Sequence, residues 1–138
     1  MSASSPAAAL AADLLSRHTA AVPIDPAALA IAEGLRVETR PLPRGAGERL
    51  EDGLLVVNAG LSPQWQRWAA ARGLGRYLLG QGTPGPLRDT DLEEFAGYLL
   101  MPEGWLGDTE NPDYDLLSDR FDVPFEVVPF RLDRWACG

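Results

Sequence analysis

The stretch Trp65–Gly80, WQRWAAARGLGRYLLG, constrains the fold most strongly because it predicts one long central helix. It contains no proline, and alanine, leucine, glutamine and arginine, which favour helices, dominate it. Two neighbouring stripes have helical spacing, one with Ala71, Leu74, Gly75 and Leu78, the other with Trp65, Trp68, Arg72, Arg76 and Leu79. The helix therefore has two faces that can make contacts, and one face carries two arginines four residues apart.

Shorter elements are expected on both sides of this helix. Helices are predicted at residues 7–16, 26–33, 62–80, 90–101, 114–121 and 124–135, and strands at residues 35–42 and 54–58. Asp25 is expected to cap the second helix and Asp89 or Thr90 the fourth, while Asp52-Gly53 is a tight-turn signal. We expect one α+β domain over residues 1–138, with a small antiparallel sheet packed against several helices and residues 1–6 frayed.

Composition limits the classes of function. The net charge of −8 gives no support to a nucleic-acid-binding surface. A single cysteine, Cys137, excludes an intramolecular disulfide and fits a reducing, cytoplasmic compartment. No apolar run approaches the length of a membrane span, and Asp13, Arg17 and His18 interrupt any secretory signal.

The central helix resembles the zinc-binding helix of the ImmA/IrrE family of metallopeptidases, which typically reads RQRFTLAHELGHYLLH. The matching positions are Arg67-Trp68, Leu74-Gly75 and Tyr77-Leu78-Leu79. Residues 22–37, 95–102 and 117–132 are similar to three further segments of the family, in the same order along the chain. The resemblance implies a zincin-like domain. It places Arg72 and Arg76 at the two histidines of the HEXXH motif, Gly73 at its glutamate, and Asp91 at the third metal ligand.

These replacements are incompatible with zinc chemistry of the family's kind. A guanidinium stays protonated and offers no lone pair to a metal, and glycine has no side chain to act as a base. We therefore expect no metal, no cofactor and no catalytic residue. We hypothesise that Arg72 and Arg76 converge on Asp91 and replace the metal bridge with a charged hydrogen-bond bridge. The alternative is that both arginines extend into solvent.

Three functions from different classes remain open at this stage. The leading hypothesis is an inactive ImmA/IrrE-like pseudo-peptidase that binds a protein partner, such as a helix-turn-helix regulator or an active paralogue, and contacts neither nucleic acid nor membrane. The second is a protein that binds an anion, or catalyses another reaction, through Arg72 and Arg76. The third is a residual metallopeptidase in which His18 and Asp91 recruit zinc.

Other chemistry-bearing residues have simpler interpretations. The segment 107–115 carries four acidic residues, Asp108, Glu110, Asp113 and Asp115. They do not have the spacing of a calcium-binding loop, and we expect them to be solvated. Glu93 and Glu94 are adjacent on a helix and are expected on a surface turn. The four tryptophans, Trp65, Trp68, Trp105 and Trp135, are expected in packing roles. Arg131 and Arg134 share their segment with two acidic residues, which argues against a recognition helix.

Overall fold

The computed structural model describes residues 5–18, 21–82, 85–107 and 110–132. Six α-helices lie in these residues, together with a short 3-10 helix, η1, at Glu103–Trp105. The α-helices are α1 (Pro6–Arg17), α2 (Pro26–Ala32), α3 (Pro63–Gly82), α4 (Asp89–Leu100), α5 (Tyr114–Phe121) and α6 (Val127–Phe130). The strands are β1 (Arg36–Arg40), β2 (Glu48–Glu51) and β3 (Leu54–Asn58), so the expected α+β class is confirmed. No helix within the described residues combines the length and apolarity that crossing a membrane requires.

The three strands form a mixed sheet in the order β1-β3-β2. The sheet was predicted to be antiparallel. This is wrong for the two predicted strands, because β1 and β3 run parallel, whereas β2 and β3 pair antiparallel. β1 and β3 are parallel because an additional strand, β2, lies between them in the chain and was not predicted from the sequence. The chain reverses direction before β2 and again after it. The second reversal is the expected turn at Asp52-Gly53, where both residues have positive φ, as a tight hairpin requires.

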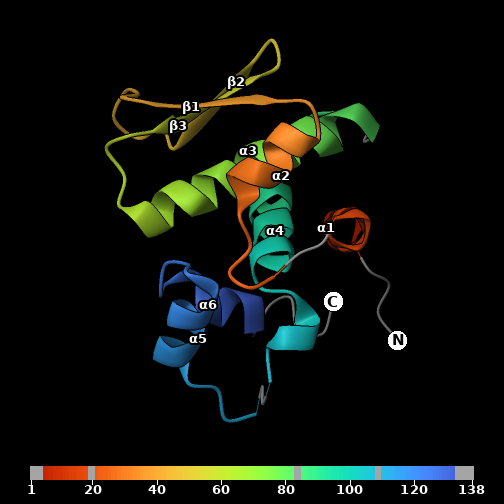
Figure 1. Cartoon of the computed structure of the whole chain (residues 1–138), viewed down its shortest axis with the longest axis vertical. Coiled ribbons are helices and arrows are strands. Elements are labelled where there is room, and N and C mark those ends of the chain that lie inside the picture. The colour runs from red at the N-terminus through yellow and green to blue at the C-terminus, as the bar shows by residue number, and fades with distance from the viewer. Residues whose placement is uncertain (1–4, 19–20, 83–84, 108–109, 133–138) are drawn as a thin grey trace.

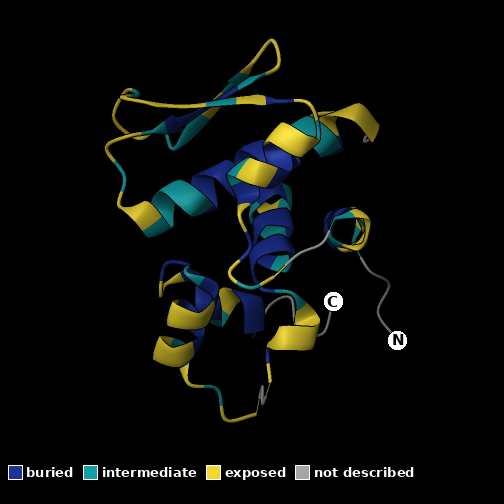
Figure 2. Ribbon diagram, viewed as in Figure 1, coloured by how far each residue is buried: buried dark blue, intermediate teal, exposed yellow. Residues whose placement is uncertain are grey.

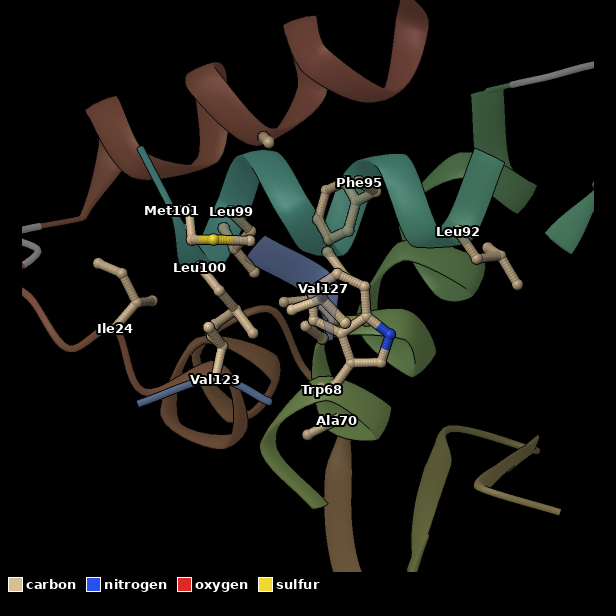
Figure 3. Close-up of a cluster of buried hydrophobic side chains, with 14 of the residues drawn as sticks. Ile24, Trp68, Ala70, Leu92, Phe95, Leu99, Leu100, Met101, Val123 and Val127 are labelled. Carbon is tan, nitrogen blue, oxygen red and sulfur yellow. The ribbon is translucent and has the colours of Figure 1, made fainter. Parts of the chain in front are cut away.

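The long helix α3 lies across the sheet, and α4 packs against its other side (Figure 1). Figure 2 shows that the middle of α3 and most of α4 are buried. α1 covers α4, and α5 and α6 pack together at the far end of the molecule. Figure 3 shows Trp68 of α3, Phe95 and Leu99 of α4, and Val123 and Val127 of the C-terminal segment in one cluster. Burial of this apolar surface holds the helices together.

Local signals set several helix ends. Asp25 accepts a hydrogen bond from the Ala28 amide at 3.1 Å and caps α2, as predicted. The predicted cap of α4 was wrong by one or two positions: the capping residue is Arg88, and the Asp91 carboxylate accepts its backbone N–H at 3.1 Å. α4 ends at Leu100, just before Pro102, because proline cannot continue a helix.

Candidate functional site

An ion-pair cluster joins α3 to β2 and α4 on the face of α3 that carries the two arginines. Arg72 and Arg76 are one helical turn apart and therefore point the same way. Strand β2 brings Glu48 to this face, and the first two turns of α4 bring Asp89 and Glu93, which are also four residues apart. Three elements distant in sequence thus contribute five charged side chains to one place.

Glu48 is the centre of this cluster. Its Oε1 accepts from Arg72 Nε at 3.3 Å and its Oε2 accepts from Arg76 Nη2 at 3.2 Å. The side chain of Glu48 is only 6% exposed and that of Arg72 16% exposed. Arg72 also donates to Glu93 through Nη1 at 3.3 Å and to Asp89 through Nη2 at 3.4 Å. The guanidinium of Arg72 therefore connects the sheet to the first two turns of α4.

The hypothesis that the arginines converge on Asp91 is wrong. Asp91 pairs with Arg88, whose Nη2 lies 3.1 Å from Oδ1, and these hydrogen bonds hold the pKa of the Asp91 carboxyl below its usual value. The reason is helix geometry. Residues 89 and 93 share a face of α4, whereas residue 91 is rotated by about 200° from residue 89. Asp91 consequently lines a small cavity beside Ser5 and Leu79.

The alternative in which both arginines extend into solvent is also wrong, because each makes at least one ion pair with the buried Glu48. Glu93, expected on a plain surface turn, belongs to the cluster. The i, i+4 spacing of Asp89 and Glu93 was the available signal. Nothing in the sequence pointed to Glu48, because its strand is short and charged.

Two glycines on α3 mark close packing. A Cβ on Gly73 would lie 2.2 Å from Cδ1 and 3.1 Å from Cγ of Leu55, a fully buried residue of β3. A Cβ on Gly75 would lie 2.6 Å from Cδ2 of Phe95 on α4. The missing side chain at Gly75 therefore permits the close approach of α3 and α4. At Gly73, the position that the resemblance gives to the catalytic glutamate, the side chain of Leu55 takes the space that a side chain would need.

A cleft of about 540 Å³ opens beside the cluster. Its lining combines a glycine-rich loop, an apolar wall and charged groups: Gly45, Ala46, Gly47, Glu48, Asn58, Leu61, Trp65, Trp68, Ala69, Arg72, Asp89 and Glu93. Asn58 fixes the loop, because its Nδ2 donates to the Ala46 carbonyl at 2.8 Å and its Oδ1 accepts from the Leu42 and Gly60 amides. These hydrogen bonds hold the loop that forms one side of the cleft.

The residues present do not fit a zinc ion. Within the described parts of the chain no three His, Cys, Asp or Glu side chains are grouped so that they could hold a metal. His18 and Asp91 do not meet: His18 follows the C-terminus of α1 and pairs with Glu33 at 2.9 Å, whereas Asp91 lies beside Ser5 at the other end. The twelve residues of α1 separate the two ends by about 18 Å.

The anion-binding alternative loses support from the same geometry. Two guanidinium groups face three carboxylates in the cluster, so the cleft carries no surplus positive charge. Arg131, considered for a recognition helix, is fully buried and stacks over Tyr98 at 4.3 Å from its ring centre. Burial lowers the pKa of this guanidinium. Asp108, Arg134, Trp135 and Cys137 lie outside the described residues.

The fold is an α+β domain similar to that of a solved Mycobacterium tuberculosis transcriptional regulator, with which the chain aligns at a TM-score of 0.66. The two are 24% identical, and the alignment covers 91% of this chain but only 45% of that one, so it shows the shared fold alone. No curated protein matches the chain. The family model described as "IrrE N-terminal-like domain" matches residues 31–133, and the chain belongs to this family.

Proposed function

We propose that this chain is a non-catalytic member of the IrrE N-terminal-like family that binds a protein partner in a regulatory role. The observation that carries the proposal is the Arg72–Glu48–Arg76 cluster, which lies on the helix face where the family resemblance puts the two metal-binding histidines. Guanidinium groups cannot ligate zinc, and Leu55 leaves no room for a base at position 73. The cleft remains open beside them.

The regulatory part of the proposal rests on analogy. Active relatives cleave helix-turn-helix repressors, and a solved structure with this fold is titled a transcriptional regulator. A protein of this fold that retains the cleft but lacks the metal ligands can still bind a protein partner without cleaving it. A helix-turn-helix regulator or an active paralogue is the partner to test, and such a role belongs in the cytoplasm.

The absence of catalysis is tested with purified protein. Zinc is added and removed by dialysis, bound metal is measured by elemental analysis, and casein and candidate regulators are incubated with and without a chelator. We expect less than stoichiometric zinc and no cleavage. Cleavage that requires zinc and stops with chelator would refute the proposal.

Partner binding is tested by photo-crosslinking in the native host. A crosslinking amino acid replaces Leu61, which lines the cleft, and in a control replaces Ile31, which is 59% exposed on α2 and does not line it. We expect one protein to be crosslinked from position 61 and not from position 31. Equal crosslinking from both positions, or none from position 61, would contradict a role for the cleft.

A further inference from the structure

The cleft beside the ion-pair cluster has an unbalanced charge. Among its lining residues, Arg72 contributes one positive charge and Glu48, Asp89 and Glu93 contribute three negative charges. Arg76 pairs with Glu48 beside the cleft and brings the net charge of the whole ion-pair cluster to −1. Arg76 is paired with Glu48, and Arg72 is shared among all three carboxylates. The lining of the cleft thus favours a cation over an anion.

The surplus charge lies on the accessible side chains. Both oxygens of Glu48 are paired and its side chain is 6% exposed, so it has no capacity for a ligand. The side chains of Asp89 and Glu93 are 84% and 45% exposed. Each contacts Arg72 through one carboxylate oxygen at 3.3–3.4 Å. The second oxygen of each carboxylate has the chemical capacity to accept a hydrogen bond from a cationic group.

An aromatic and apolar wall adjoins these carboxylates. Trp65 is half-buried and lines the cleft together with Leu61 and Ala69. An indole face attracts a guanidinium or ammonium group, and an apolar wall suits the aliphatic part of an arginine or lysine side chain. The combination of an aromatic wall, two accessible carboxylates and a cavity matches a cation on an aliphatic stem.

We infer that the cleft binds an arginine or lysine side chain of a basic segment of the protein partner. This inference rests on the proposed function and names the chemistry of the partner. The occupant is argued from charge complementarity, at two levels. One entering cation brings the net charge of the ion-pair cluster to zero, and the net charge of −8 on the whole chain attracts a basic partner from a distance.

The test uses the peptide Ac-Gly-Ala-Arg-Ala-Gly-NH2 and the same peptide with citrulline, which has the shape of arginine without its charge. Binding to the full chain is followed by NMR, through the indole N–H of Trp65. We expect the arginine peptide to bind about five- to tenfold more tightly, and this preference to shrink at about 0.5 M salt. Agmatine, a guanidinium without a peptide, is expected to bind about tenfold more weakly than the arginine peptide.

Two double variants separate the cleft from general charge effects. Asp89→Asn with Glu93→Gln removes the accessible carboxylates, and we expect the preference for arginine over citrulline to disappear. The control is Asp119→Asn with Glu126→Gln, which changes the net charge equally at exposed positions outside the cleft lining and should retain the preference. Trp65→Leu removes the NMR probe, so binding to this variant is followed through the indole N–H of Trp68, which also lines the cleft. This variant should bind the arginine peptide more weakly and leave binding of the citrulline peptide unchanged.

Equal affinity for the two peptides, or an unchanged preference after loss of Asp89 and Glu93, would overturn the inference. Agmatine that binds as tightly as the peptide would overturn the assignment to a peptide segment. Mass spectrometry of the recovered peptide keeps the two proposals apart. Zinc-dependent cleavage would refute the proposed function and leave the cation site standing, whereas an intact peptide with no charge preference would refute only the cation site.

Discussion

Substitution of Gly73 by alanine tests whether α3 is closed against the sheet at the position of the family's catalytic glutamate. In an exposed helix, glycine to alanine stabilises by about 0.5–1 kcal/mol, because the unfolded chain has less freedom to lose. At Gly73 the new Cβ meets Leu55 at 2.2–3.1 Å, and overpacking of this kind costs about 1–3 kcal/mol. The two effects oppose each other, and we expect overpacking to be the larger one.

The matched control is Gly80→Ala in the last turns of the same helix, where nothing lies within 4 Å of the added Cβ. Urea unfolding followed by tryptophan fluorescence gives the free energy of unfolding for both variants. We expect Gly80→Ala to be as stable as the wild type or more stable, and Gly73→Ala to be about 1–3 kcal/mol less stable than Gly80→Ala.

A double-mutant cycle locates the cause. Leu55→Ala alone should cost about 2–5 kcal/mol by opening a cavity. Combined with Gly73→Ala, the total loss should fall below the sum of the single losses by about 1 kcal/mol or more, because the cavity accepts the new methyl group. If Gly73→Ala is as stable as Gly80→Ala, or if the two losses simply add, Leu55 does not close this position.

Three further predictions concern other parts of the structure. Glu48→Gln should lower the free energy of unfolding by about 2–3 kcal/mol in the same urea assay, because Arg72 and Arg76 lose their buried carboxylate partner. The control Glu51→Gln, on the exposed side of β2, should change the free energy of unfolding by less than about 0.5 kcal/mol. Arg131→Ala should cost about 3–5 kcal/mol through a cavity, and Arg131→Met, which keeps the volume, about 1–2 kcal/mol; equal losses would contradict this account. A hydrogen bond from His18 lowers the pKa of Glu33 below its ordinary 4.5, so the ionised Glu33 stabilises the folded chain fully above pH 4.5 and loses this effect as the pH falls through its lower native pKa. Glu33→Gln should therefore make the urea midpoint less dependent on pH between about pH 5 and pH 3.

Local sequence signals predicted most of the helices. The spacing of apolar residues and the prolines at helix ends placed α1, α2, α3 and α5 within one or two residues of their observed bounds. These signals act between residues that are close along the chain, and so they survive without tertiary information. The same holds for Asp52-Gly53, whose turn conformation depends on its own two residues.

The sequence by itself determined the central helix, its paired arginines and the order of motifs that assigns the family. It did not determine which acids the arginines meet. Arg72 and Glu48 are 24 residues apart in the chain, and their contact depends on β2, a strand whose charged residues form no apolar pattern. Tertiary structure also decided which face of α4 meets the arginines, and it is the face with Asp89 and Glu93 rather than the face with Asp91. The physical reason is that the packing of whole helices and strands determines which charged side chains come into contact. Local helix and strand propensities contain no information about that packing.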